Sequence, residues 1–145
     1  MAHGGMCVAR HEGRVVFVRH ALPGEHVRAR VTEGTGGSRY WRADAIEILE
    51  PSADRVVAPC PYAVPGGCGG CDWQHAAPAA QRRLKATVVA EQLTRLAGLD
   101  WPVEVERVPG ASDEGLGWRT RVSFAVGSDG RPGLHKHRSH EVVRI

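Results

Sequence analysis

Three cysteines lie close together near the middle of the sequence. Their spacing is Cys60-x7-Cys68-x2-Cys71, and glycines occupy positions 66, 67, 69 and 70 around the last two. Because glycine has no side chain, the backbone can turn tightly and direct its amides toward sulfur, so that three thiolates converge on one metal ion or cluster. Thiolate ligation of this kind serves iron–sulfur clusters and zinc alike.

The spacing leaves the fourth ligand open, since a cubane iron–sulfur cluster usually takes four cysteines. His75 follows Cys71 by four residues, and with it the site would be a Cys3His zinc site, because zinc accepts mixed sulfur and nitrogen ligands. Cys68 and Cys71 also have the spacing of a redox pair, but a thioredoxin-like motif needs a βαβ setting that this sequence lacks. Cys7 stands in an apolar stretch and is predicted to be a buried core residue.

Basic side chains concentrate in the last part of the sequence. Residues 119–145 contain six arginines and lysines against two acidic residues. A local surplus of this kind is typical of a surface that contacts nucleic-acid phosphates, although a solvated strand face has the same composition. The net charge of the whole chain is only +3, which does not indicate nucleic-acid binding by itself.

The part of the chain before the cysteines is predicted to consist of short strands. Residues 14–18 are a β-branched and aromatic run, residues 26–32 alternate small apolar with basic side chains, and residues 40–49 resemble a further strand. Turns are expected at Pro23-Gly24 and in the glycine-rich stretch 34–37. Closely spaced strands with glycine turns and no helix indicate a small barrel, as in oligonucleotide-binding folds, with a small β-sandwich as the alternative.

The part that carries and follows the cysteines has a different character. Its glycines and prolines exclude a regular helix or strand over residues 59–71, so something else must order this loop. A helix is predicted next, because Pro78 suits a first turn, Gly98 suits the position after a last turn, and a stripe of apolar residues lies between them. That stripe consists of Leu84, Val88, Leu93 and Leu96. Strands are predicted at 103–108, 118–126, 134–137 and 141–145, with a hairpin turn at 128–130.

Composition and length set the class of the protein. The chain has 145 residues, is 42% hydrophobic, and has no apolar run near the roughly 18 residues that suggest a membrane span. Residues 1–5 have neither the basic nor the apolar region of a secretory signal, so a cytoplasmic location is expected. The predicted fold class is α+β: mainly β with one helix, a small OB-like barrel followed by a cysteine loop, a helix and a β-rich segment.

Several blocks of the sequence resemble known protein families. Residues 3–10 and 13–25 resemble the TRAM domain, an RNA-binding β-barrel. The block 59–75, which ends in Cys-Gly-Gly-Cys-Asp-Trp-Gln-His, resembles the iron–sulfur segment of the bacterial RNA uracil-5-methyltransferase family. Residues 117–122 and 133–143 resemble the β-rich central segment of the same enzymes, and the order of these blocks is more specific than any one of them.

The resemblance implies a domain organisation for the N-terminal part of such an enzyme. A TRAM barrel is expected at 1–52, an iron–sulfur cysteine loop at 53–77, and a helix with the start of a central β-rich domain at 78–145. The family's catalytic Rossmann-like domain is absent, its first barrel strand has no counterpart before residue 3, and its fourth cluster cysteine is expected just beyond Ile145. The gap between the first two cluster cysteines is also longer than in the common family pattern, seven residues instead of five.

The resemblance also implies a function. Family members transfer a methyl group from S-adenosylmethionine to carbon 5 of uracil in RNA, and a TRAM domain beside a cluster is most similar to the members that modify 23S ribosomal RNA, which implies a role in rRNA processing. This chain is expected to bind RNA and to ligate a 4Fe-4S cluster through Cys60, Cys68 and Cys71, with no catalytic residue of its own. S-adenosylmethionine would bind in the missing domain, and the full-length protein is expected to be a monomer without membrane contact. The alternative is a stand-alone TRAM-type RNA-binding module with a structural Cys3His zinc site. The residues expected to contact RNA are Arg119, Arg121, Lys136, Arg138, Arg14, Arg19 and Arg28.

Overall fold

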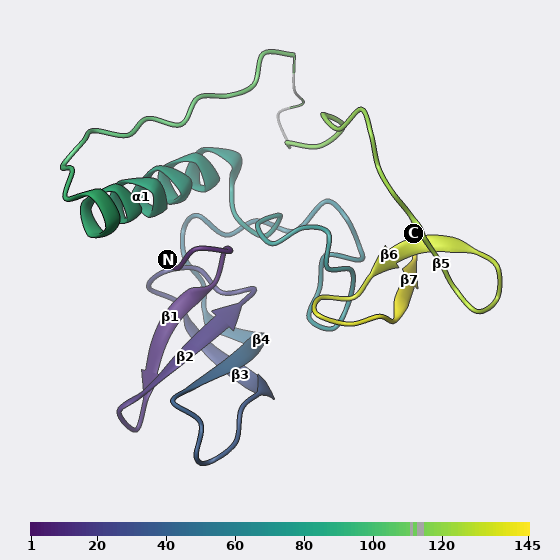
Figure 1. Cartoon of the computed structure of the whole chain (residues 1–145), viewed down its shortest axis with the longest axis horizontal. Coiled ribbons are helices and arrows are strands. Elements are labelled where there is room, and N and C mark those ends of the chain that lie inside the picture. Colours follow the sequence, from purple (N-terminus) through teal and green to yellow (C-terminus); the bar gives the residue numbers. More distant parts are fainter. Residues whose placement is uncertain (111, 113–114) are drawn as a thin grey trace.

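The computed structural model describes residues 1–110, 112 and 115–145. It contains a four-stranded sheet, a long loop that leads into one helix, and a three-stranded sheet near the C-terminus (Figure 1). The class is mainly β with one helix, as the sequence predicted. None of the helices in this described part combines the length and apolarity needed to cross a membrane.

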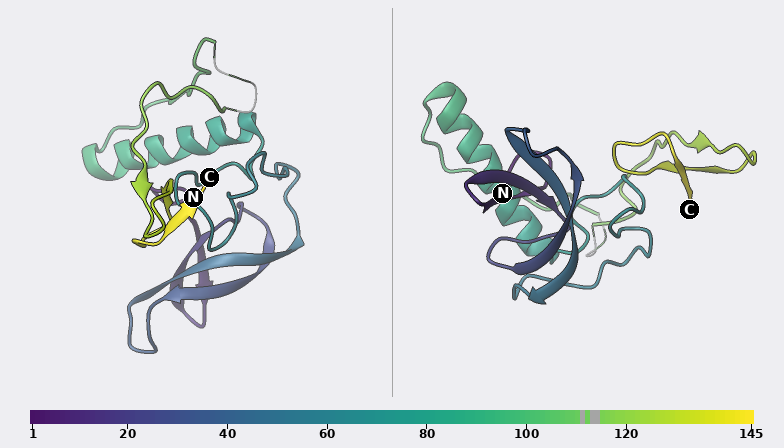
Figure 2. Two further views of the ribbon diagram at one scale, coloured as in Figure 1. Left: turned by 90° about the vertical axis from the view of Figure 1, so that its right-hand side faces the viewer. Right: turned by 90° about the horizontal axis from the view of Figure 1, so that it is seen from below.

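The N-terminal sheet has the strand order β1-β2-β4-β3. Strands β1 and β2 form an antiparallel hairpin, β2 pairs with β4 in parallel, and β3 pairs with β4 antiparallel. Three register shifts interrupt the β3–β4 ladder, and such bulges increase the bend and twist of a strand pair. The sheet is therefore curled (Figure 2), but β1 and β3 remain as its edges and the barrel is not closed. Its strands are β1 (Cys7–His11), β2 (Arg14–Arg19), β3 (His26–Glu33) and β4 (Tyr40–Glu50).

The core of this sheet is small. Alternate residues of a strand point to the same face, and the inward positions of β2 and β4 are occupied by valine and alanine. The buried cluster consists of Val16, Val18, Ala21, Ala43 and Ala45, and it is joined at its border by Cys7, Val27, Trp41 and Ile48. Cys7 is thus only half-buried, although it packs against the core as predicted.

Helix α1 spans Pro78–Ala97 and has the ends that the sequence predicted. Pro78 occupies the first turn, and Gly98 follows the last residue with a left-handed φ of 64°, where its amide donates to the carbonyl of Thr94. The predicted apolar stripe is present but only partly covered. Ala80 is the one buried residue of the helix, whereas Leu96 is 82% exposed.

The C-terminal sheet is formed by three short antiparallel strands, β5 (Ala125–Val126), β6 (Pro132–His135) and β7 (Val142–Arg144). The predicted hairpin turn lies between β5 and β6, where Gly130 has a φ of 76°. Two strand predictions were wrong in whole or in part. Residues 103–108 form no strand, and of residues 118–126 only the last two do. Their composition suits a strand, but a strand forms only where a neighbour takes up its backbone hydrogen bonds.

Candidate metal loop and nucleic-acid surface

The cysteine loop is ordered by a series of backbone turns. The amide of Ala63 donates to the carbonyl of Cys60 at 3.1 Å, and the amide of Cys68 donates to the carbonyl of Tyr62 at 2.9 Å. At the start of the loop the amide of Cys60 donates to Oε1 of Gln74 at 3.1 Å, which joins the loop's two ends. Glycines and prolines therefore give a defined path here without a regular helix or strand.

The second half of the loop packs on the C-terminal sheet. This sheet lies at the right in Figure 1. The amide of Gly69 donates to the carbonyl of His135 at 2.9 Å, and Cys68 pairs with Lys136 as an isolated antiparallel bridge. A Cβ atom at position 69 would lie 2.7 Å from the backbone nitrogen of His137. Glycine is required at this position because the two backbones touch.

All three thiols of the loop are free and half-buried. The amide of Gly70 donates to Sγ of Cys68 at 3.3 Å, which is the kind of hydrogen bond that stabilises a ligand thiolate. Within the described residues, no three His, Cys, Asp or Glu side chains are arranged to hold one metal ion. A cluster is a different case, because its cysteine ligands bind separate iron atoms.

His75 contacts the N-terminal sheet. Its Nε2 lies 3.3 Å from the carbonyl oxygen of Ala21, and its ring centroid lies 6.0 Å from that of His20. Burial lowers the pKa of His75 below its usual value, and the positive charge of Arg55 adds to this effect, while the Ala21 carbonyl opposes it. These contacts hold the His75 imidazole against the barrel. They do not favour His75 as the zinc ligand that its spacing from Cys71 allowed.

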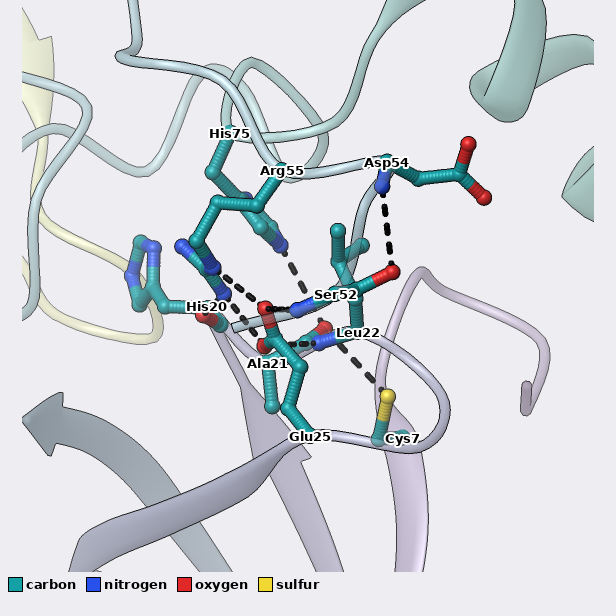
Figure 3. A network of polar contacts seen from close by, with 9 residues as sticks. All are labelled: Cys7, His20, Ala21, Leu22, Glu25, Ser52, Asp54, Arg55 and His75. Carbon is teal, nitrogen blue, oxygen red and sulfur yellow. Dashed lines mark hydrogen bonds and ion pairs between the residues drawn. The ribbon is translucent and has the colours of Figure 1, made fainter. Parts of the chain in front are cut away.

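A buried carboxylate joins the barrel to the segment that leads to the cysteine loop (Figure 3). The side chain of Glu25 is 0% exposed and accepts hydrogen bonds from Nε and Nη2 of Arg55 at 2.5 and 2.6 Å. It also accepts from the amides of Leu22 and Ser52, and Arg55 donates further to the carbonyl of His20. Burial by itself would raise the pKa of Glu25, but the hydrogen bonds and the Arg55 charge outweigh it and lower that pKa. We call the Glu25–Arg55 pair the clasp.

A second contact between the barrel and the cysteine loop involves Arg19, one of the residues predicted to contact RNA. Arg19 at the end of β2 has a side chain that is 7% exposed, and its Nη2 lies 2.8 Å from Oδ1 of Asp72. This burial and pairing do not favour Arg19 for contact with RNA, and its predicted RNA contact stays a prediction. Nearby, the indole of Trp73 lies directly on Gly5, where a Cβ would be 2.2 Å from the ring nitrogen.

The other two predicted RNA contacts of the barrel are more accessible. Arg14 lies over the ring of Trp41 at 4.3 Å and donates to the carbonyl of Gly36 at 2.5 Å. Arg28 is exposed and pairs with Glu47 at 2.7 Å. The two arginines lie on different strands, Arg14 on β2 and Arg28 on β3.

The C-terminal basic residues fall into two groups. Lys136 and Arg138 lie in the turn between β6 and β7, beside Cys68. Lys136 pairs with Glu141 within this turn, whereas Arg138 reaches Glu33 of the barrel at 3.5 Å.

The second group lies on an irregular segment. Arg119 and Arg121 are exposed, and the guanidinium of Arg119 lies 5.2 Å from the ring centroid of Trp118. Trp118 is itself 59% exposed.

The outer face of the barrel sheet carries three side chains that the sequence analysis did not select. Phe17 and Tyr40 contact each other edge to face at 5.5 Å, and the guanidinium of Arg42 lies over both rings. Alternation along β2 and β4 places these residues opposite the core, but only the parallel pairing of the two strands brings them together. That pairing joins strands separated by β3 and has no local signal in the sequence.

Comparison with known proteins finds similarity both over the barrel and over the chain as a whole. Residues 2–46 match the model of the TRAM domain. The whole chain is 63% identical to an uncharacterized RNA methyltransferase of Streptomyces avermitilis, of which it covers 36%, and 61% identical to one of Streptomyces coelicolor, of which it covers 34%. It is 36% identical to a 23S rRNA (uracil(1939)-C(5))-methyltransferase of Shewanella sp. strain MR-4 over 99% of the chain and 31% of that enzyme. The chain thus spans about a third of the length of the relatives it matches.

Proposed function

We propose that this chain, which carries a TRAM domain and is similar along its whole length to part of several RNA methyltransferases, supplies RNA binding to an enzyme that methylates carbon 5 of uracil. The observation that carries the proposal is the 36% identity with a 23S rRNA uracil-C5 enzyme, which extends through the cysteine loop and the C-terminal sheet and is not confined to the barrel. We propose 23S rRNA as the substrate and S-adenosylmethionine as the methyl donor.

Exposed basic side chains support the RNA-binding part of the proposal. Arg119 and Arg121 are exposed on one segment, and Arg138 is half-exposed beside the barrel. Guanidinium groups suit this role because they form paired hydrogen bonds with phosphates and stack on unpaired bases. Lys136, Arg14 and Arg28 remain candidates, but each of them, like Arg138, already pairs within the chain and must exchange that partner for a phosphate.

The cysteine loop supports a cluster site. We propose that Cys60, Cys68 and Cys71 ligate a 4Fe-4S cluster, with a fourth thiolate from outside these residues. The free thiols and the amide of Gly70 directed at Cys68 Sγ fit such a donor set. When bound, the cluster contributes metal–thiolate bonds, and the free energy of such bonds adds to the folding free energy of a small loop.

The chemical step is proposed to take place elsewhere in the whole protein. A uracil methyltransferase of this type needs a cysteine nucleophile, and thiolate character decides whether a cysteine can serve. Burial raises the pKa of Cys7 to about 11, which leaves its thiol protonated and unreactive at neutral pH. The other three cysteines are those of the proposed cluster, so the nucleophile is assigned to the remaining part of the enzyme.

Methyl transfer tests the functional proposal. Labelled S-adenosylmethionine is incubated with unmodified 23S rRNA and either this chain or the whole protein that contains it. The whole protein is expected to label uracil and the chain alone to be inactive. Labelling by the chain alone would contradict the assignment of the nucleophile, and inactivity of the whole protein on ribosomal and transfer RNA would overturn the family of reactions proposed.

Metal analysis tests the cluster. The whole protein is purified without oxygen, and its iron, sulfide and zinc contents are measured beside those of the Cys68→Ser and His75→Gln variants. Iron with equimolar sulfide that is lost in the cysteine variant alone is the expected result. One zinc per chain that is lost in both variants would instead establish the stand-alone Cys3His arrangement.

A further inference from the structure

The outer face of the barrel sheet has a continuous row of side chains across its four strands. Val8 pairs with Phe17, Phe17 with Arg42, and Arg42 with Glu33, so these residues lie side by side on one face. Tyr40 lies in the next row of the same face. Since the opposite face holds the buried valines and alanines, this row lies opposite the core.

This row contains an aromatic surface with little cover. Tyr40, the first residue of β4, is 43% exposed, and Val8 on the edge strand β1 is 52% exposed. The ring centroids of Phe17 and Tyr40 are 5.5 Å apart with an interplanar angle of 80°. Phe17 thus contacts one side of the Tyr40 ring, and part of that ring stays open to solvent.

The arginine beside these rings has unused hydrogen-bonding capacity. The guanidinium carbon of Arg42 lies 5.8 Å from the Phe17 ring centroid and 5.5 Å from that of Tyr40. Its Nε is buried and makes no hydrogen bond within the described part of the chain, although Glu33 Oε2 lies 3.4 Å away. A buried arginine donor that lacks a hydrogen bond costs free energy, so exchange of the Glu33 carboxylate for another anion removes no hydrogen bond from this atom.

The surroundings of the rings are basic on balance. Arg10 is exposed on the same face of β1, and Arg138 approaches from the turn between β6 and β7. Glu33 is the one acidic side chain of this row, and it lies within 4 Å of both Arg42 and Arg138. A polyanion could displace this single carboxylate from two guanidinium groups at once.

We propose that this face binds an unpaired nucleotide of single-stranded RNA, with the base stacked on Tyr40 and the adjacent phosphate taken by Arg42 and Arg138. The proposal rests on the RNA-binding function proposed above and names the form of RNA that this face accepts. Proteins read single-stranded RNA by stacking splayed bases on aromatic rings and guanidinium planes, and each such base contributes markedly to affinity. A duplex keeps its bases stacked within the helix and cannot offer one to Tyr40.

The charge distribution favours RNA over a protein partner. An apolar protein surface that covered this face would bury Arg10, Arg42 and Arg138 together, with the single carboxylate of Glu33 against three guanidinium groups. A nucleotide offers a flat ring and a phosphate at adjacent positions, which matches the arrangement of Tyr40 and the arginines. The row therefore has the chemistry of a stacking site with an anion site beside it.

Binding of labelled RNA by variants of this chain tests the proposal. The probe is a fluorescent single-stranded RNA of about 12 nucleotides, compared by anisotropy with the same strand annealed to its complement. Tyr40→Ala is expected to weaken single-strand binding roughly tenfold and to leave duplex binding unchanged. Tyr40→Phe keeps the ring and is expected to bind as the parent chain does. Trp101→Ala is the matched control, because Trp101 is 66% exposed and lies after α1, outside the strands of the barrel sheet.

The outcomes separate this inference from the proposed function. Circular dichroism and thermal unfolding establish that each variant is folded, and Tyr40→Leu replaces Tyr40→Ala if the smaller side chain unfolds the sheet. Equal affinities of the Tyr40→Leu and Tyr40→Phe variants for single-stranded RNA would overturn the stacking site. They would not contradict the proposal that the chain binds RNA. Absence of any RNA binding by the parent chain would overturn both. Self-association that is lost in the Tyr40 variants, with RNA affinity unchanged, would assign the face to a second copy of the chain.

Discussion

His20 is a buried histidine where the barrel meets the segment that carries the cysteines. It follows the last residue of β2 with a left-handed φ of 62°, and its Nε2 is buried without a hydrogen-bond partner in the described residues. Burial lowers the pKa of His20 from 6.5 to about 4, and the positive charges of Arg19 and His75 add to this effect, while Asp44 and Asp72 oppose it. The folded chain therefore holds this imidazole neutral at all but acidic pH.

The lowered pKa predicts that the chain loses stability in mild acid. Because the folded state binds this proton less readily than the unfolded state, stability from His20 is complete above the unfolded pKa of 6.5 and is lost as the pH falls toward about 4. At about pH 5 the loss should be roughly 2 kcal/mol. Urea unfolding at about pH 7.5 and about pH 5 measures it.

The matched variant for this measurement is His20→Asn. Asparagine accepts the left-handed conformation at this position and does not titrate. Its unfolding free energy should change less between the two pH values than that of the parent chain. An equal change in both proteins would assign the acid sensitivity to other groups, such as His75, whose pKa is also lowered, or Glu25, whose contribution is lost only at lower pH.

At the scale of elements, the clasp is predicted to be worth far more than an exposed ion pair of the same type. Glu25→Ala leaves Arg55 partly buried without its carboxylate, which should cost about 3–5 kcal/mol of unfolding free energy. Glu47→Ala removes the partner of Arg28 on the exposed side of the sheet and should cost at most about 1 kcal/mol. Denaturant unfolding of the two variants compares them directly, and similar costs would show that the clasp is not a structural contact of this strength.

The contact of the cysteine loop with the C-terminal sheet gives a second prediction at this scale. Gly69→Ala places a methyl group 2.7 Å from the backbone nitrogen of His137, so the two segments must separate at a cost of about 1–3 kcal/mol. Hydrogen exchange at residues 60–71 and 133–137 should accelerate in this variant. Gly36→Ala, where the added methyl group meets no atom within 4 Å, should leave both segments as they are. Unchanged exchange in the Gly69→Ala variant would contradict the observed docking.

The elements differ in how well the sequence predicted them. The strands of the barrel, the helix from Pro78 to Gly98 and the hairpin turn at 128–130 were predicted because each depends on local alternation, capping or turn residues. The burial of Arg19 was not predicted, because its partner Asp72 lies far along the chain. The strand prediction at 103–108 failed for the converse reason, since its local pattern is right but none of the strands in the described residues pairs with it.

The candidate sites show the same division. The sequence selected the three cysteines, whose spacing is local, and the structure adds the amide of Gly70 directed at Cys68. It did not select Phe17, Tyr40 and Arg42, because neither their type nor their spacing sets them apart until β2 and β4 pair. The three cysteines as ligands of one cluster remain a prediction.

At the scale of the whole molecule, RNA affinity is predicted to depend on salt through the exposed arginines. Each phosphate contact to a single strand contributes about 0.7 to the slope of log affinity against log salt. Arg119→Ala combined with Arg121→Ala should therefore reduce the magnitude of that slope by up to about 1.4. Anisotropy titrations at several salt concentrations measure it.

The control for this prediction removes the same charge elsewhere. Arg82→Ala with Arg95→Ala changes two arginines of α1 and should alter the slope much less. If both double variants changed the slope equally, RNA binding would follow net charge alone and Arg119 and Arg121 would have no special position.

The clasp also has a thermodynamic consequence for the whole protein. The barrel has a small core, and Glu25, Arg55 and the Arg19–Asp72 pair join it to the segment that carries the cysteines. Two parts joined by buried ion pairs unfold together, so free energy gained in one is shared by the other. A ligand that binds the cysteine loop in the folded state thereby raises the population of the folded barrel, and RNA bound on the barrel favours the folded loop by the same linkage.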